Sequence, residues 1–304
     1  MCSDVAHAAA PLDISAELVR RLIDSQFPQW SSLAIKSVAP QGIDNRTFRL
    51  GTQLSVRLPA GDRYAGQVAK EQRWLPRLAP QLPLAIPQPV AMGTPAYCYP
   101  HHWSVYRWLE GTTAAQTITD WRPIARRLAE FLRALRGINP SGGPRPGPHN
   151  FFRGASVSVY SDEAQAAIDD LGDDIDGSAV RAAWAAAVDS RWTGEPRWFH
   201  GDIAADNLLT HDGCLTAVID FGLSGIGDPA CDSVIAWTHF DGASRNAFRR
   251  ALGVDAATWR RGRGWALWKA LITLRSSLEA DHQRAAAACR AIIERILSDH
   301  AADH

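Results

Sequence analysis

The sequence has few cysteines, and their number and spacing argue against a disulfide framework and against a structural zinc site. Only five of its 304 residues are cysteine, at positions 2, 98, 214, 231 and 289. They are odd in number and lack the close paired spacing of structural zinc sites. We therefore expect free thiols, which fits a protein of the reducing cytoplasm.

Long apolar runs and excess charge are also missing. No apolar run approaches the ~20 residues that span a bilayer. Residues 1–7 lack the charged region and apolar core of a signal peptide. The 32 basic and 32 acidic residues give a formal net charge of zero, so no overall field favours nucleic acid or a membrane. The sequence favours a cytoplasmic protein with a small-molecule partner and leaves its oligomeric state open.

The most informative stretch is a pair of short apolar runs around Asp212-Gly213. This dipeptide between such runs indicates a β-hairpin. One predicted strand starts at Asn207 and the other ends at Asp220, so their side-chain oxygens would lie side by side. Oxygen ligands of this kind suit Mg²⁺ together with phosphate groups. Asp202, five residues before Asn207, can face the same site.

These groups form a pattern that phosphoryl transfer uses, because that chemistry depends on positioning and charge neutralisation. His-Gly-Asp at 200–202, Asn207 and Asp-Phe-Gly at 220–222 resemble the catalytic loop and metal motif of the kinase superfamily. Protein kinases carry arginine at the position of Gly201. The chain therefore resembles the aminoglycoside phosphotransferase family, from about residue 30 to about residue 275.

The resemblance implies an α+β, two-lobed protein-kinase-like fold. Residues 1–108 would form a nucleotide-binding lobe with an antiparallel sheet and one key helix, and residues 109–304 a mostly helical catalytic and substrate-binding lobe. The hydrophobic periodicity agrees with this order of elements. It predicts strands at 34–38, 47–50, 54–58, 90–93 and 103–109, and helices at 11–27, 62–78 and 120–136.

The resemblance also assigns roles in the large lobe. Asp202 is the expected catalytic residue, which orients an acceptor hydroxyl and takes its proton late in the reaction. Asn207 and Asp220 are the expected ligands of Mg²⁺, with ATP or GTP as the phosphoryl donor. His200 is expected to hold the catalytic loop by hydrogen bonds, and Asp232 to brace it.

In the small lobe, Arg57 and Glu71 match the basic residue that grips the nucleotide phosphates and the helical acid that holds it. Arginine replaces the usual lysine, and the two are not interchangeable, although a guanidinium still binds phosphate in a bidentate manner. A surface arginine beside an exposed glutamate is the alternative. The effect of the replacement stays open.

Two further small-lobe segments are candidates for nucleotide binding. Gly42 and Asn45 lie in a connection, residues 40–46, at the position of the phosphate-covering loop. This connection has one glycine, so a plain hairpin loop is the alternative. The backbone of Arg107, Trp108 and Leu109 would form the hinge that meets the adenine edge.

An aminoglycoside-like antibiotic is the predicted acceptor, because the resemblance and a run of acidic residues point the same way. Like-charged groups around a cleft attract counter-ions, although a solvated helix face is the plainer interpretation. Macrolide kinases, metabolic kinases for choline, homoserine or sugars, and a non-catalytic nucleotide-binding module are the alternatives. The acidic residues are Asp162, Glu163, Asp169, Asp170, Asp173, Asp174 and Asp176.

Overall fold

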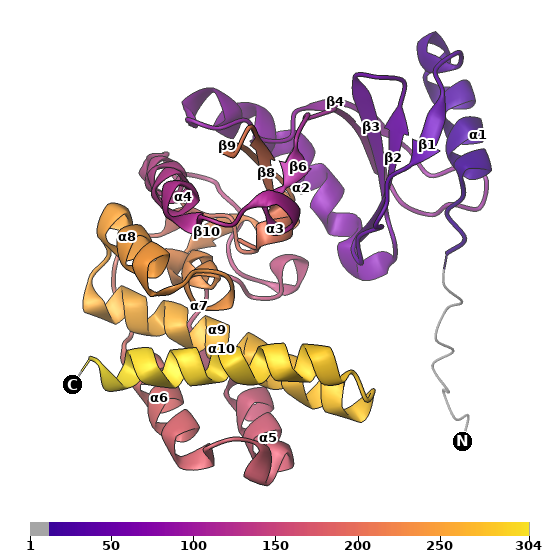
Figure 1. The fold of residues 1–304 in the computed structure, drawn as a ribbon. Helices are drawn as coiled ribbons and strands as arrows, with labels where there is room; N and C mark the ends of the chain where they lie inside the picture. The colour runs from indigo at the N-terminus through magenta and orange to yellow at the C-terminus, as the bar shows by residue number, and fades with distance from the viewer. Residues whose placement is uncertain (1–11, 304) are drawn as a thin grey trace. The chain divides into compact units, whose positions relative to one another are not determined.

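The computed structural model describes residues 12–303, and the chain divides into two compact units (Figure 1). The first unit holds the residues up to Arg77 together with Pro87–Leu109. The second holds Leu78–Ile86 and the chain from Glu110 onward.

The first unit is built on a five-stranded antiparallel sheet with strand order β1-β2-β3-β5-β4. All five strands match the predicted positions to within two residues at each end, and β5 stops two residues short of its predicted end. The bounds are β1 Ile35–Ser37, β2 Asn45–Leu50, β3 Leu54–Pro59, β4 Pro89–Gly93 and β5 Trp103–Arg107.

Two helices accompany this sheet, α1 (Ala16–Gln26) and α2 (Asp62–Leu78). The apolar face of α1 packs into one core with sheet residues such as Val56 and Trp103. The start of α1 is fixed by Ser15, whose side chain accepts a hydrogen bond from Leu18 N at 3.3 Å. The predicted helix over 11–27 therefore starts later than expected, and its first residue lies outside the described part of the chain.

The second unit contains two small sheets. The first has the order β6-β8-β9, and its β8–β9 hairpin is the one predicted from the sequence. Asp212 and Gly213 have φ of 50° and 75°, as a two-residue turn of this kind requires. The strands are β6 Thr112–Thr113, β8 Leu208–His211 and β9 Cys214–Val218, and the second sheet pairs β7 Arg197–Phe199 with β10 Gly225–Gly227.

The rest of the second unit is helical. The predicted helix over 120–136 is present as α4, and Asp120 caps it by accepting from Arg122 N at 3.1 Å. The α-helices are α3 Ala114–Thr117, α4 Trp121–Gly137, α5 Ser161–Leu171, α6 Gly177–Asp189, α7 Ile235–Thr238, α8 Gly242–Leu252, α9 Ala256–Glu279 and α10 Gln283–Ala301. The 3₁₀ helices are η1 Pro28–Trp30 and η2 Ala79–Gln81, then η3 Pro148–Asn150, η4 Val157–Tyr160, η5 Gly172–Asp174, η6 Ala205–Asn207, η7 Phe221–Leu223 and η8 Pro229–Ser233.

Helix α9 is the central element of the second unit. It packs against α10, α6, α5 and η8, and Figure 1 shows α10 running beside it. The approach to η8 is close because position 262 is glycine: a Cβ there would lie 2.7 Å from the Cβ of Ser233. Among residues 12–303, no helix has the length and apolar character needed to cross a membrane. The cysteines at 98, 214, 231 and 289 are free thiols.

Residues 78–86 join the second unit through an edge contact. Ala85 N donates to Thr216 O at 3.2 Å, and Val218 N donates to Ala85 O at 3.0 Å. These two bonds form an isolated parallel bridge between Ala85 and Ala217 of β9. The segment therefore extends the hairpin that precedes Asp220.

We predict that the start of α9 contributes a pH-dependent part of the stability. Asp255 accepts from Thr258 N at 2.6 Å, and this backbone bond lowers the pKa of the Asp255 carboxyl. A carboxyl with a lowered pKa stabilises the fold above its unfolded pKa, and the contribution is lost as the pH falls through the folded pKa. Asp255→Ala should lower the free energy of unfolding by about 1 kcal/mol at neutral pH.

Urea denaturation from pH 7 down to about pH 3 checks this, since the unfolded pKa of aspartate is about 3.9. The loss in Asp255→Ala should shrink toward the acid end. The matched control is Asp255→Asn, whose amide oxygen caps the helix without a charge, and it should retain most of the stability. An equal loss at every pH would show that the carboxylate charge contributes nothing.

Candidate active site

The residues between β7 and η6 form a loop, and one buried carboxylate holds it by hydrogen bonds. Asp232, on η8, has no solvent exposure. Its carboxylate accepts from His200 N at 3.1 Å and from Gly201 N at 2.8 Å. Burial raises the pKa of Asp232, and the positive charge of Arg136 opposes that shift. The sequence-based prediction that Asp232 braces this loop is confirmed by these bonds.

His200 ties the loop to the end of the hairpin. Its Nδ1 accepts from Asp202 N at 3.2 Å, and its Nε2 lies 3.0 Å from the carbonyl oxygen of Ile219. Because Nδ1 is the acceptor, the ring proton belongs on Nε2, which donates to Ile219 O. This arrangement confirms that His200 holds the loop by hydrogen bonds.

Gly201 has a conformation that a larger residue would not adopt without strain. Its φ is +86°, and a Cβ would lie 2.6 Å from the carbonyl oxygen of Leu223. Both facts favour glycine. A side chain at this position would require the turn or the Leu223 carbonyl to shift.

Asn207 and Asp202 interact directly. The Asn207 amide nitrogen donates to the backbone oxygen of Asp202 at 2.9 Å and to its Oδ2 at 3.1 Å. Ile219 N donates to the carbonyl of Asn207 at 2.9 Å, which brings the backbone next to Asp220 alongside Asn207. Asp220 itself has a left-handed backbone with φ of 66°. Asp202 and Asn207 are thus in contact at the open end of the hairpin, and Asp220 follows the residue whose N–H binds Asn207.

The donor set fits a magnesium ion. The amide nitrogen of Asn207 is used by Asp202, so its oxygen is the atom left to bind a cation. Asp220 is partly exposed at the same end of the hairpin. Mg²⁺ binds through one or two protein oxygen ligands together with phosphates and waters, and these two residues supply such a set. The assignment of Asn207 and Asp220 as metal ligands stays a prediction.

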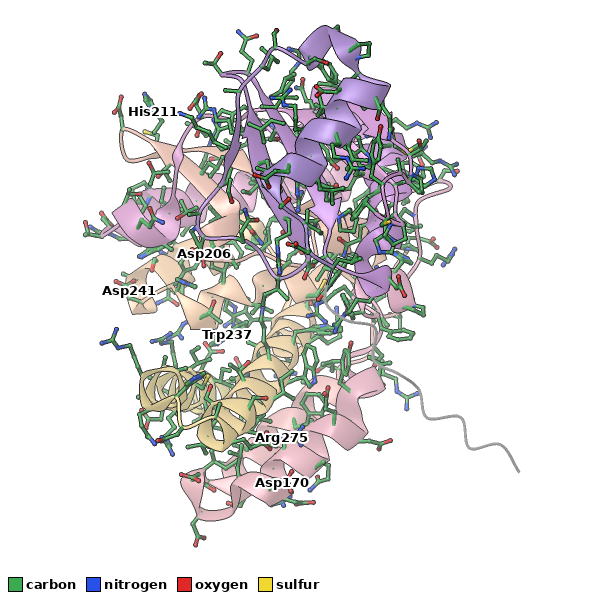
Figure 2. The ribbon with its side chains drawn as sticks, turned by 90° about the vertical axis from the view of Figure 1, so that its right-hand side faces the viewer. Asp170, Asp206, His211, Trp237, Asp241 and Arg275 are labelled. Atoms are coloured by element: carbon green, nitrogen blue, oxygen red, sulfur yellow. The ribbon has the colours of Figure 1, made fainter. Side chains whose placement is uncertain are left out.

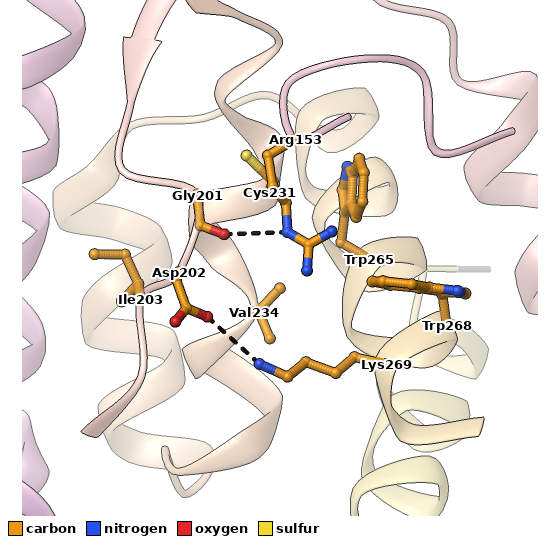
Figure 3. Close-up of a pocket in the computed structure, with 9 residues that line it drawn as sticks. All are labelled: Arg153, Gly201, Asp202, Ile203, Cys231, Val234, Trp265, Trp268 and Lys269. Carbon is orange, nitrogen blue, oxygen red and sulfur yellow. Dashed lines mark hydrogen bonds and ion pairs between the residues drawn. The ribbon is translucent and has the colours of Figure 1, made fainter. Parts of the chain in front are cut away.

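A small pocket adjoins Asp202 and contains two residues that the sequence did not single out for chemistry. Lys269, on α9, places its Nζ 3.5 Å from Asp202 Oδ1. Arg153 donates from Nε to the carbonyl of Gly201 at 3.1 Å. Figure 3 shows both side chains directed into the space beside Asp202. The remaining lining residues are Ile203, Cys231, Val234, Trp265 and Trp268.

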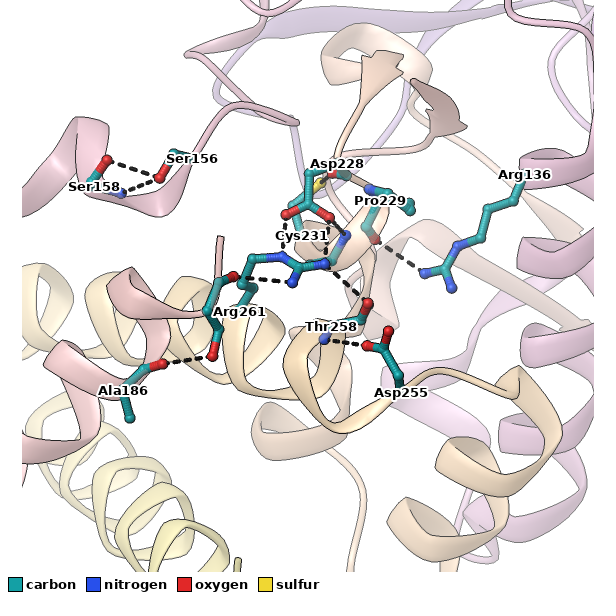
Figure 4. A network of polar contacts seen from close by, with 12 residues as sticks. Arg136, Ser156, Ser158, Ala186, Asp228, Pro229, Cys231, Asp255, Thr258 and Arg261 are labelled. Carbon is teal, nitrogen blue, oxygen red and sulfur yellow. Dashed lines mark hydrogen bonds and ion pairs between the residues drawn. The ribbon is translucent and has the colours of Figure 1, made fainter. Parts of the chain in front are cut away.

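A buried ion pair fixes the start of η8 (Figure 4). Asp228 accepts from Ala230 N at 3.1 Å and caps η8 immediately before Pro229. Arg261 Nε donates to Asp228 Oδ2 at 2.7 Å, and both side chains are almost fully buried. Burial raises the pKa of Asp228, while Arg261 opposes the shift. This pair anchors the turn that leads to Asp232.

In the first unit, Arg57 and Glu71 lie together as predicted. Arg57 Nη1 is 3.9 Å from Glu71 Oε1, which is a loose ion pair, and both side chains are largely buried. Tyr106 donates its hydroxyl to the other oxygen of Glu71. Burial and the Glu71 charge raise the pKa of Tyr106, so it remains a donor. The alternative of a surface pair is wrong for these two residues.

The loop candidates lie on either side of the start of β2. Gly42 is exposed in the connection, whereas Asn45 is the first residue of β2 and is buried. The strand starts two residues earlier than predicted because Asn45 and Arg46 pair with Pro59 and Leu58. Gln41 closes the connection, accepting from Thr47 N at 2.8 Å. Nucleotide binding by Gly42 and Asn45 stays a prediction.

The predicted hinge has fewer available donors than its sequence suggests. Arg107 N donates to Gln88 O at 2.9 Å, and Trp108 N donates to Gln53 O at 2.8 Å. Both N–H groups are therefore used within the first unit. A base contact from this segment would have to use the N–H of Leu109 or a carbonyl oxygen.

Much of the acidic run is neutralised within the second unit. Asp170 pairs with Arg275 of α9 at 3.2 Å, and Figure 2 shows the two side by side. Asp169 pairs with Arg181 and Asp174 with Arg290. The carboxylate of Asp176 caps α6, and that of Glu163 accepts from Trp268. These contacts support a structural role for the run rather than attraction of a polycation.

Comparison with known proteins agrees with this geometry. The family model "APH: Phosphotransferase enzyme family" matches residues 37–265. A comparison with curated protein sequences gives no match.

Solved structures resemble the chain over nearly its whole length. The GDP and kanamycin complex of APH(2")-IIia has a TM-score of 0.69 and 23% identity, and covers 94% of this chain and 99% of its own. A GDP complex of a mutant of aminoglycoside 2'-phosphotransferase-IIIa gives 0.72 and 23%, over 95% and 100%. Macrolide 2'-phosphotransferase MphH from Brachybacterium faecium gives 0.61 and 19%, over 91% and 96%. The likeness shows that the fold is α+β and kinase-like, as predicted.

We predict that Asp232→Asn destabilises the protein. The amide keeps one acceptor oxygen, but its nitrogen then faces a backbone N–H in a site without solvent exposure. A buried donor without a partner costs about 1–3 kcal/mol. Urea denaturation at pH 7 should show a loss of this size. The control is Asp212→Asn, a side chain with 90% exposure in the hairpin turn, which should change little. Equal stability of the two variants would contradict the bracing role.

Proposed function

Because this chain belongs to the phosphotransferase enzyme family, we propose that it transfers the γ-phosphoryl group of ATP or GTP to a hydroxyl of a small molecule. The observation that carries the proposal is the contact of Asp202 with Asn207 at the open end of the hairpin, where the backbone leading to Asp220 is bonded to Asn207. Intact side chains at all three positions argue against the non-catalytic nucleotide-binding module.

Asp202 is proposed to act on the acceptor. A carboxylate is a weak base toward an alcohol, so its main work is to orient the hydroxyl toward the γ-phosphorus. The hydroxyl oxygen forms the new bond to phosphorus, the bond to the β–γ bridging oxygen breaks, and the nucleoside diphosphate leaves. The hydroxyl proton passes to the Asp202 carboxylate. Asn207 fixes that carboxylate from one side and Lys269 from another.

Nucleotide-binding roles are proposed for residues of each unit, taken by itself. Arg57, held by Glu71, is proposed to bind the phosphates, with the backbone near Gly42 and Asn45 covering them and residues 107–109 meeting the base. Asn207 and Asp220 would hold Mg²⁺, which neutralises charge on the phosphates when bound. Two of the similar structures are GDP complexes, which supports a nucleotide donor.

The aminoglycoside-like acceptor predicted from the sequence has mixed support. The kanamycin complex of APH(2")-IIia favours it, and the likeness to a macrolide phosphotransferase favours the macrolide alternative. Identities of 19–23% do not decide between them. The ion pairs of Asp169, Asp170 and Asp174 weaken the second argument for a polycation. The residues of the pocket beside Asp202 are therefore the remaining basis for inferring the chemical class of the acceptor.

Release of ADP or GDP by the purified chain tests the proposed function. Mg-ATP and Mg-GTP should each be tried with aminoglycosides, macrolides, choline, homoserine, sugars and sugar acids. Asp202→Asn should lower kcat by about 10²–10⁴-fold, the usual contribution of a positioned acid or base, and leave the nucleotide-induced rise in melting temperature unchanged.

Asp212→Asn serves as the matched control, since it makes the same change at an exposed turn position, and its turnover should equal that of the wild type. Release that persists in Asp202→Asn would contradict the assigned role. A rise in melting temperature without release on any acceptor would favour the binding module.

Arg57 provides a separate prediction for the first unit. Arg57→Gln should raise KM for the nucleotide by about tenfold, because a charge-assisted bond contributes about 1.5–3 kcal/mol. Arg57→Lys should recover part of this loss as a point charge without the bidentate geometry. Steady-state kinetics with varied nucleotide would measure both, and an unchanged KM in Arg57→Gln would show that Arg57 does not bind the phosphates.

A further inference from the structure

The pocket beside Asp202 has a positively charged wall. Arg153 and Lys269 are both directed into it, and Asp202 is the one carboxylate among its described lining residues (Figure 3). Lys269 is already paired with Asp202 at 3.5 Å. An acceptor that enters this pocket to reach Asp202 therefore meets the remaining positive charge of Arg153.

Arg153 has no acidic partner. Its side chain is 9% exposed, and its partners are neutral: the carbonyls of Gly201 at 3.1 Å and Phe151 at 3.4 Å, and the hydroxyl of Tyr160. Within residues 12–303 no carboxylate lies at ion-pair distance from it. Buried charges are usually paired, because removing a charge from water is costly. A ligand anion would supply the missing partner.

The aromatic residues of the pocket do not offer a site for a ligand cation. Ammonium groups often bind over the faces of tryptophan and tyrosine. Here the Arg153 guanidinium lies 5.0 Å from the ring centroid of Trp265 and 4.9 Å from that of Trp268. Tyr160 stacks on Trp268 with ring centroids 4.0 Å apart. The rings are thus already in contact with a cation of the protein itself.

The nearby acidic groups lie outside the pocket lining. Glu163 accepts from Trp268 Nε1 at 2.7 Å, and its charge acts on Tyr160 with the opposite sign to that of Arg153. Asp170, on α5, pairs with Arg275 of α9. Among the described lining residues themselves, two positive charges stand against one negative charge.

We propose that the acceptor of this enzyme carries an anionic group, a carboxylate or a phosphate, near the hydroxyl that is phosphorylated. The inference rests on the proposed function and names its substrate class. Arg153 binds the anion, Lys269 adds attraction while it holds Asp202, and the hydroxyl faces Asp202. Polycationic acceptors are disfavoured because they bring like charges to Arg153 and Lys269.

A matched set of six-carbon sugars tests this inference by direct binding. D-glucuronate and D-glucose 6-phosphate are anionic, D-glucuronamide is neutral and D-glucosamine is cationic. Isothermal titration calorimetry would use the full chain saturated with Mg-ADP. At least one anion should bind about tenfold tighter than the amide, since a charge-assisted pair commonly contributes that much, and glucosamine should bind most weakly. The better of the two anions identifies carboxylate or phosphate as the recognised group.

Two variants assign the preference to the pocket. Arg153→Gln should remove most of the anion preference and change amide binding by less than about twofold. Lys269→Gln, at a side chain with 47% exposure, should reduce the same preference and serves if Arg153→Gln fails to fold. The control is Arg275→Gln, which removes an arginine from the same helix outside the pocket and should leave the preference unchanged.

Three results would overturn the inference. They are tighter binding of glucosamine or kanamycin than of either anion, no saturable anion binding at concentrations up to about 50 mM, and an unchanged preference in both pocket variants. The outcome is separable from that of the proposed function. Asp202-dependent phosphorylation of kanamycin would uphold the proposed function and contradict the anionic acceptor. Selective anion binding without release of nucleoside diphosphate would support the anion site and contradict the proposed function.

Discussion

The buried carboxylate of Asp232 is the contact on which the candidate active site depends. It accepts from two successive backbone N–H groups, at His200 and Gly201, in a position with no solvent exposure. A buried charge is stable only when it is hydrogen-bonded and electrostatically compensated. Here the two N–H groups and the positive charge of Arg136 provide this environment. The position of the loop, and with it that of Asp202, follows from satisfying one buried charge.

The sequence predicted the parts of the site that are local in the chain. The β8–β9 hairpin depends on a two-residue turn and two short apolar runs, all within about a dozen residues, so the pattern contains the necessary information. The bracing by Asp232 crosses about thirty residues, and only the resemblance to a family made that contact predictable.

The parts that the sequence did not predict are set by long-range packing. Arg153 reaches the carbonyl of Gly201 across 48 positions, and Lys269 reaches Asp202 across 67. Neither residue belongs to a local pattern, since each is an ordinary basic residue whose role depends on how α9 packs. The acidic run failed as evidence for the acceptor for the same reason. Two of its partners, Arg275 and Arg290, lie 105 and 116 positions away in the chain, so composition alone shows negative charges that the fold pairs with distant arginines.

Amide hydrogen exchange at His200 and Gly201 tests most directly whether Asp232 holds the catalytic loop. Both N–H groups donate to a carboxylate with no solvent exposure, so they should exchange only when the second unit unfolds. Their protection measured by NMR should equal that of buried amides in α9, although they belong to a loop. Exchange at the rate of an exposed loop would show that the loop opens independently, and would contradict the account of how Asp202 is positioned.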